Sequence, residues 1–206
     1  MRLFYSTIVI LASTSLSAAQ YYFGYGSNLS CNFMVERLKN GDWIDSYHKA
    51  GQLIGPLPKD LGVYVLSDYE FGYTLDAEPF GDQGSAANIE PKAGSKVYGA
   101  LYQITDEQLR ILDKTEDEPI AYTRTALKVR RLALPDIFQL PLDVSEKSLD
   151  EITAWVYVGN SKFLTREKCP DPEYAHVIIE AAKKRCLPKG YIDKVLTDRA
   201  FATCSN

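Results

Sequence analysis

The sequence is poor in side chains that bind metals. Its 206 residues include only two histidines, His48 and His176, and no C-x-x-C pair. Because zinc sites are built from such residues at short spacings, we expect no metal site. The chain also has no internal repeat, no low-complexity tract and no block of like charges long enough to form a tail. With 46% hydrophobic and 24% charged residues, it has the composition of one globular domain.

A segment long enough to cross a bilayer is also missing. The most apolar stretch runs from Leu3 to Leu11, directly after the charge of Arg2. A transmembrane helix takes about twenty residues, so this stretch is too short to be an anchor. The segment STSLSAA (13–19) would make a poor helix, which also disfavours a first helix of the fold.

Residues 1–19 instead have the pattern of a secretory signal peptide. Ser17 and Ala19 fit the small–x–small rule for a cleavage site before Gln20. We therefore expect a secreted protein, extracellular or periplasmic, with one domain over residues 20–206 and no stable membrane anchor after cleavage. The mature chain would hold 22 basic and 27 acidic residues, and this charge of −5 argues against nucleic acid and anionic membranes as partners.

Four cysteines, an even number, suggest two disulfides in a secreted protein, although buried free thiols are the alternative. Cys169 and Cys186 flank a predicted helix of about fifteen residues, which would separate them by roughly 20 Å. A disulfide needs Cα atoms within about 7 Å of each other. We therefore expect Cys31 to pair with Cys169 or Cys186, and Cys204 to take the other.

Strand patterns come first in the chain, and the longest helix comes late. Because helices do not alternate with strands, the order favours an α+β fold over a doubly wound sheet. Its sheet is expected to be mainly antiparallel and could curl into a barrel. The segments with strand patterns are Tyr21–Tyr25, 61–66 and 69–75 with a break at Asp68, Ser95–Ile104, Tyr122–Val129 and Thr153–Val158.

Capping residues predict where the helices begin. TDEQ at Thr105 is a capping box, and Asp171-Pro172 begins a helix that ends at Arg185. Shorter helices are expected from Ser30 to Leu38 and from Lys189 to Thr197. The remaining segments, Glu78–Lys92, Asp113–Pro119 and Leu132–Leu149, are expected to be loops or turns.

The stretch FGYGSN ends the first strand in a turn with little side-chain bulk. Its G-x-G lacks the third glycine and the later acidic residue of a dinucleotide-binding fingerprint. Glycine at Gly26 allows a positive φ or the close approach of a ligand. Exposed N–H groups before a helix can bind an anion such as a carboxylate. A plain left-handed turn capped by Asn28 and Ser30 would fit the same residues.

The second candidate is an acidic segment in which four carboxyl groups crowd one turn: Asp113, Glu116, Asp117 and Glu118. Like charges this close raise at least one pKa when they are partly buried, which suits proton transfer near neutral pH. A solvated acidic loop is the alternative, and the spacing does not single out one of the four.

Tyrosine is abundant, at fourteen residues, and most tyrosines are expected in the core or on the sheet surface. The phenols of Tyr122, Tyr157 and Tyr174 could reach a pocket, but a structural role is the commoner reading for each alone.

Taken together, five segments resemble the gamma-glutamylcyclotransferases. They follow that family's order and cover nearly all of the chain after residue 19: YFGYGSNL (22–29), VYGALYQIT (97–105), LDKTEDEPIAYTR (112–124), AWVYV (154–158) and PEYAHVIIEAAKKRCLPKGY (172–191). The resemblance implies a small antiparallel β-barrel with flanking helices, the C-terminal ones packed on it. It also implies cyclisation of γ-glutamyl amino acids, which releases 5-oxoproline and a free amino acid with no metal or cofactor.

The resemblance also assigns roles to residues. Glu116, in L-D-x-x-E, resembles the catalytic acid/base. Tyr174, in P-x-Y, resembles a residue near the substrate, and Tyr122 and Tyr157 are weaker matches. The turn resembles the substrate-binding loop and comprises Tyr22, Phe23, Gly24, Tyr25, Gly26, Ser27 and Asn28.

The sequence departs from the family pattern in four respects. Asp117 and Cys186 stand where the family has glycine, the insert at 132–149 is longer than expected, and the family is mostly cytosolic. These departures bear on the substrate more than on the reaction. Two alternatives stay open: a cyclotransferase for γ-glutamylamines or another γ-glutamyl metabolite, and a secreted binding protein that has no need of Glu116. The protein could also form a homodimer.

Overall fold

The computed structural model describes residues 19–39, 51–81, 84–132 and 150–202. The proposed signal peptide lies outside the described residues except for Ala19. The insert at 132–149 lies outside them except for Leu132, and Cys204 lies outside them as well.

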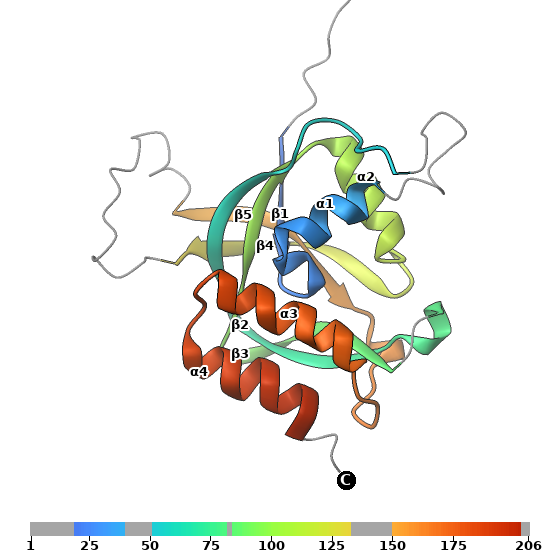
Figure 1. The fold of residues 1–206 in the computed structure, drawn as a ribbon, viewed down its shortest axis with the longest axis vertical. Helices are drawn as coiled ribbons and strands as arrows, with labels where there is room; N and C mark the ends of the chain where they lie inside the picture. The colour runs from blue at the N-terminus through green and yellow to red at the C-terminus, as the bar shows by residue number, and fades with distance from the viewer. Residues whose placement is uncertain (1–18, 40–50, 82–83, 133–149, 203–206) are drawn as a thin grey trace, which may run out of the picture.

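The core of the fold is a closed five-stranded barrel in the order β1-β3-β2-β4-β5 (Figure 1). Neighbouring strands pair antiparallel except β1 and β5, which pair in parallel where Tyr22 meets Trp155. The strands are β1 (Gln20–Gly24), β2 (Lys59–Asp76), β3 (Ser85–Ile104), β4 (Tyr122–Arg131) and β5 (Glu151–Gly159). The α+β prediction with a small, mainly antiparallel barrel is confirmed.

Two long strands form the largest part of the barrel, and they correct two sequence predictions. Strands β2 and β3 pair from Lys59 to Asp76 along their whole length. The predicted loop Glu78–Lys92 is wrong from Ser85 onward, because these residues pair with the second half of β2. Asp68 does not end a strand: it takes a left-handed φ of 62° at a bulge, and its carboxylate accepts the N–H of Gly94 at 2.8 Å.

Helices α1 and α2 lie near one end of the barrel, against the turn that follows β1 (Figure 1). The short 3₁₀ helix η1 (Ser27–Leu29) leads into α1 (Cys31–Lys39), and α2 (Asp106–Thr115) follows β3. The capping box is confirmed, since Thr105 Oγ1 accepts the N–H of Gln108 and Gln108 Oε1 accepts the N–H of Thr105. The helix extends three residues into the acidic segment that was expected to be a turn.

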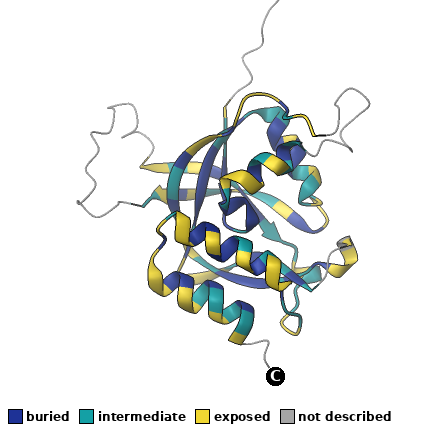
Figure 2. Cartoon of the chain, viewed as in Figure 1, coloured by how far each residue is buried: buried dark blue, intermediate teal, exposed yellow. Residues whose placement is uncertain are grey.

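Helix α3 (Pro172–Lys184) crosses the barrel next to the C-terminal helix (Figure 1). Asp171 caps it by accepting the N–H groups of Glu173 and Tyr174 at 2.8 and 3.0 Å, as its position before proline predicted. The last segment is longer than expected, with α4 (Lys189–Tyr191) continuing as a π-helix, η6 (Ile192–Ala202). Figure 2 shows that α3 buries the face toward the barrel and exposes the other.

The predicted disulfides of Cys31 are wrong. Cys31, at the start of α1, and Cys186, after α3, are both exposed free thiols. The segments that carry them are joined by a polar contact instead, in which Arg185 Nε donates to the carbonyl of Leu29 at 2.5 Å.

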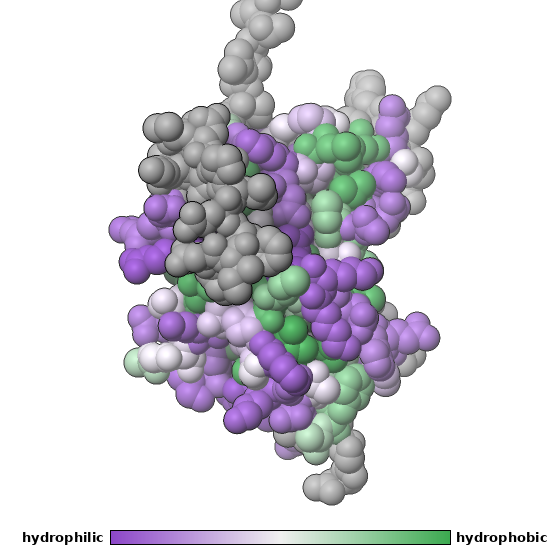
Figure 3. Space-filling view, turned by 60° about the vertical axis from the view of Figure 1, so that its left-hand side comes forward, coloured by the Kyte–Doolittle hydropathy of each residue, from purple (hydrophilic) through white to green (hydrophobic). Residues whose placement is uncertain are grey.

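None of the helices among the described residues is long and apolar enough to cross a bilayer. On the face shown in Figure 3, hydrophilic side chains dominate and the hydrophobic areas between them are small.

Candidate active site

The bare turn of FGYGSN places the chain against strand β3. A Cβ on Gly26 would lie 3.1 Å from the Cβ of Ala87 and 3.6 Å from the hydroxyl of Tyr174, which is a tight approach. Gly26 itself has a φ of −94°, so the expected left-handed conformation is not what requires glycine here. No acceptor among the described residues takes the backbone N–H groups of Gly26 and Ser27. They remain available to a ligand.

Glu116 lies at the C-terminal end of α2 and faces this turn. Its Oε1 accepts one bond from Arg37 at 3.0 Å and one from the amide of Asn28 at 3.2 Å. Its Oε2 accepts no hydrogen bond from the part of the chain that the structure describes. The Glu116 side chain is only 14% exposed. The fold brings it into contact with Asn28, although the two residues are far apart in the sequence.

Burial raises the pKa of the Glu116 carboxyl above its ordinary value. Arg37 and Asn28 act in the opposite direction, and the charge of Asp117 adds to the increase. Burial also raises the pKa of the phenols of Tyr22 and Tyr122, so both are neutral at neutral pH. Glu116 is therefore better suited than either phenol to exchange a proton there.

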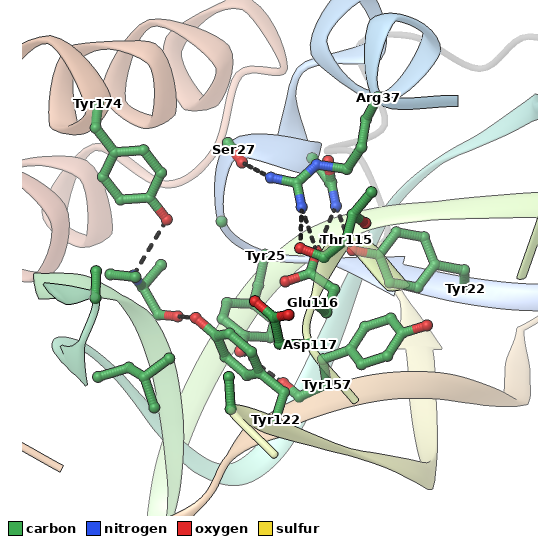
Figure 4. A pocket seen from close by; sticks show the side chains of 17 residues that line it. Tyr22, Tyr25, Ser27, Arg37, Thr115, Glu116, Asp117, Tyr122, Tyr157 and Tyr174 are labelled. Atoms are coloured by element: carbon green, nitrogen blue, oxygen red, sulfur yellow. Dashed lines mark hydrogen bonds and ion pairs between the residues drawn. The ribbon is translucent and has the colours of Figure 1, made fainter. Parts of the chain in front are cut away.

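Asp117 is the next residue and lines the same cavity (Figure 4). It adopts a left-handed φ of 47°, and its carbonyl accepts the N–H groups of Ile120 and Ala121. This conformation explains why the family pattern has glycine at this position. Its carboxylate makes no hydrogen bond or ion pair with any described residue.

Tyrosines from four strands or helices complete the walls. The Tyr122 hydroxyl donates to the carbonyl of Ala87 at 2.7 Å. The backbone N–H of Ala87 donates to the Tyr174 hydroxyl at 3.1 Å. Tyr25 donates to the carbonyl of Tyr157 at 2.6 Å. The Tyr157 hydroxyl points away from the middle of the cavity in Figure 4 and donates to Asp113.

The structure brings together most of the residues that the sequence singled out. The cavity has a volume of about 120 Å³, and the candidates that line it are Tyr22, Tyr25, Gly26, Ser27, Asn28, Glu116, Tyr122, Tyr157 and Tyr174. Phe23 and Gly24 do not line it. Phe23 is fully buried in the core against Gly99, and Gly24 pairs with Ala100 and lies against Asn28.

Sequence reasoning missed Arg37, which is the only basic residue among those lining the cavity. It lies on α1 and also donates to the carbonyl of Thr115 and to Ser27 Oγ, both at 3.4 Å. Nothing in its spacing from Glu116 signals the contact. The only local indication is the spacing of four residues between Phe33 and Arg37, which places both side chains on the same face of α1.

A second hollow adjoins the cavity and shares Arg37, Ala77, Ala86 and Tyr174 with it. It has a volume of about 580 Å³ and is also lined by Phe33, Ser85 and Asp171. Within the described ranges, no group of three or more His, Cys, Asp or Glu side chains is placed to hold a metal ion. The arrangement is thus a small polar cavity that contains a buried carboxyl with a raised pKa and adjoins a larger hollow.

Comparisons with known proteins bear on the fold of the chain. No curated protein sequence matches the chain significantly. A solved structure named gamma-glutamyl cyclotransferase is 21% identical, with a TM-score of 0.61 over 87% of this chain and 88% of that one. An uncharacterized protein from Homo sapiens is 22% identical, with a TM-score of 0.61 over 87% of each chain.

A third solved structure, a gamma-glutamyl cyclotransferase specific to glutathione from yeast, is 13% identical. Its TM-score is 0.53 over 88% of this chain and 96% of that one. Residues 96–195, which include Glu116 and Tyr174, match the AIG2-like family. Residues 96–195 are therefore similar to the AIG2-like family, and the chain has the fold of the solved gamma-glutamyl cyclotransferase structure.

Proposed function

We propose that the protein is a gamma-glutamylcyclotransferase, which cyclises γ-glutamyl amino acids to 5-oxoproline and a free amino acid. The observation that carries this proposal is the Glu116 carboxyl, which has one unpaired oxygen, in a cavity also lined by Gly26 and Ser27. The N–H groups of these two residues have no acceptor among the described residues. The names of the fold relatives support the same reaction class.

The reaction needs one group that takes a proton and returns it. The α-amino nitrogen of the substrate forms a bond to the γ-carbonyl carbon, and the bond from this carbon to the leaving nitrogen breaks. Glu116 Oε2 takes the proton that the attacking nitrogen loses and gives it to the leaving nitrogen. No water is consumed and no atom is oxidised or reduced.

The rest of the site folds and holds the substrate. The unpaired N–H groups of the turn would bind the α-carboxylate, and the leaving group would extend into the hollow beside Phe33. Holding amine and carbonyl in contact can contribute on the order of 7–11 kcal/mol to lowering the barrier.

The test is an assay of 5-oxoproline and free amino acid from a panel of γ-glutamyl dipeptides. We expect the two products in equal amounts from the wild type and a very low rate from Glu116→Gln. If the wild type turns over no γ-glutamyl compound, including γ-glutamylamines, the enzyme proposal fails and a binding protein is left. If Glu116→Gln keeps the wild-type rate, another group carries the proton.

We also propose that the protein acts after secretion, because residues 1–19 have the pattern of a signal peptide. The N-terminus of the mature protein, isolated from its host, should be Gln20. A mature chain that begins at Met1 would contradict secretion without affecting the proposed reaction.

A further inference from the structure

The cavity contains one more acidic group than the proposed reaction needs. The charged residues that line it are Arg37, Glu116 and Asp117, so it has a formal charge of −1 when both carboxyls are ionised. Arg37 and Glu116 form an ion pair with each other at 3.0 Å. The negative charge that is left over belongs to Asp117, which has no partner among the described residues.

The same cavity is lined by two further residues that have unused hydrogen-bond acceptors, Asn28 and Glu116. Asn28 is only 3% exposed, and its Oδ1 is buried without a hydrogen bond. The orientation of this amide follows from its Nδ2, which donates to the Glu116 carboxylate and to the hydroxyl of Tyr22. Together with Glu116 Oε2 and the Asp117 carboxylate, the cavity offers three acceptors that lack a donor.

An ammonium group has three N–H donors, one positive charge and no acceptor. Its three donors match these acceptors in number, and its charge offsets the leftover negative charge. A buried acceptor such as Asn28 Oδ1 costs free energy while it stays unpaired. A ligand that donates a hydrogen bond to it would remove this cost. The backbone N–H groups of Gly26 and Ser27, by contrast, lie on the turn and suit an anion.

We infer that Asp117 is a substrate-binding residue that, with Asn28, holds the α-ammonium of the γ-glutamyl group and so selects substrates with a free α-amine. This inference rests on the proposed function and deepens it. Asp117 binds the ammonium form on arrival. Glu116 takes one of its protons before the attack and gives it to the leaving nitrogen. The second proton, lost as the ring nitrogen becomes a lactam N–H, passes through Glu116 to the released amine, which leaves as an ammonium. The aspartate is tolerated in a left-handed conformation because aspartate adopts it more readily than most residues do.

The test compares Asp117→Asn and Asp117→Gly with the wild type. For a γ-glutamyl dipeptide we expect KM to rise about tenfold and kcat to change less than about threefold, because a charge-assisted hydrogen bond is lost. The inhibition constant of 5-oxoproline should stay unchanged in both variants, because its lactam nitrogen carries no charge. Glu118→Gln is the matched control, since it removes the next carboxylate, which does not line the cavity.

An unchanged KM in Asp117→Asn would overturn the inference. A rise of KM and of the 5-oxoproline constant by the same factor would also overturn it, because Asp117 would then shape the cavity rather than bind the ammonium. Unfolding does not mimic the expected result, since Asp117→Gly relieves a left-handed aspartate and should melt no lower than the wild type.

The inference can be tested even if the proposed reaction fails. If the wild type releases no 5-oxoproline, titration calorimetry measures binding of the dipeptide and of its N-acetylated form, which has no ammonium. We then expect the dipeptide to bind about tenfold more weakly to Asp117→Asn than to the wild type. Equal affinity of the wild type for the dipeptide and its N-acetylated form, or no binding of either, would contradict ammonium recognition.

Discussion

Two arginine–carboxylate pairs, whose carboxylates lie one helical turn apart, differ in how many of their hydrogen-bond acceptors are used. Arg124 contacts Asp113 at 2.6 Å, and the residues come from L-D-x-x-E and Y-x-R of the same segment. Asp113 also accepts the hydroxyl of Tyr157 at 2.8 Å, and Arg124 stacks on Trp155 at 4.8 Å. Both carboxylate oxygens are used, so this group of four residues is complete without a ligand.

The pair of Arg37 and Glu116 is incomplete by comparison. Only one oxygen of Glu116 is used, the amide oxygen of Asn28 is unpaired, and Asp117 has no partner among the described residues. The exposures of the two pairs are similar, at 29% and 20% for Arg124 and Asp113 and 21% and 14% for Arg37 and Glu116. Unused acceptors in a cavity, rather than burial or the presence of an arginine, mark the pair that can bind a substrate.

The largest expected effect comes from removing each carboxylate charge in turn. Glu116→Gln should lower kcat/KM about a thousandfold, because the group proposed to exchange the proton is lost. Asp113→Asn keeps an acceptor for Tyr157 and should change kcat/KM by less than about tenfold, since the charge it loses does not face the reacting atoms. The measurement is 5-oxoproline release, with circular dichroism to check the fold. Equal losses in the two variants would mean that both pairs belong to the catalytic machinery.

The second comparison removes the two arginines and measures stability. Arg124→Ala should lower the free energy of unfolding by about 2 kcal/mol, because Asp113 loses its ion-pair partner and the ring of Trp155 becomes exposed. This loss is smaller than that from breaking a fully buried ion pair, because both side chains are partly exposed. Arg37→Ala should cost less, because the Glu116 carboxyl can take up a proton and become neutral. Urea unfolding followed by circular dichroism measures both values, and a greater loss for Arg37→Ala would reverse this ranking.

The pH profile of kcat/KM separates the same two arginines. Glu116 must be ionised to accept the proton, so activity falls as the pH drops through its pKa, which is already raised. Arg37 lowers that pKa, so Arg37→Ala should move the acidic limb to higher pH. Arg124→Ala should leave the limb where it is. A limb that stays fixed in Arg37→Ala would show that another group titrates.

Much of the fold could be predicted from the sequence, because local signals determine it. The Thr105 capping box, the Asp171 cap and the aromatic strand β5 lie where their residues indicated. The first half of β3 could not be predicted in this way, because Ser85–Lys92 contains the polar and turn-forming residues of a loop. It becomes a strand through pairing with β2, which is a contact distant in sequence.

The site was predictable in its parts but not in its assembly. The sequence suggested the turn at Gly26 and the acids near Glu116, and the family resemblance joined them. It gave no sign of Arg37, whose partner lies at the end of another helix, far away in sequence, or of the pairing between Asp113 and Arg124. Two departures from the family pattern proved informative, since Asp117 and Cys186 both have a left-handed φ, at 47° and 54°. Glycine suits both positions for the same reason.

The smallest expected effect concerns these two left-handed residues. Asp117→Gly and Cys186→Gly should each raise the free energy of unfolding by about 0.5 kcal/mol, since relief of the left-handed conformation outweighs the greater freedom of glycine in the unfolded chain. Only Asp117 lies beside the incomplete pair, so only Asp117→Gly should also lower the pKa of Glu116 and move the acidic limb of kcat/KM to lower pH. Thermal melting and the pH profile measure the two effects on the same samples. A shift of the limb in Cys186→Gly would mean that backbone strain, and not the neighbouring carboxylate, sets the proton affinity of the site.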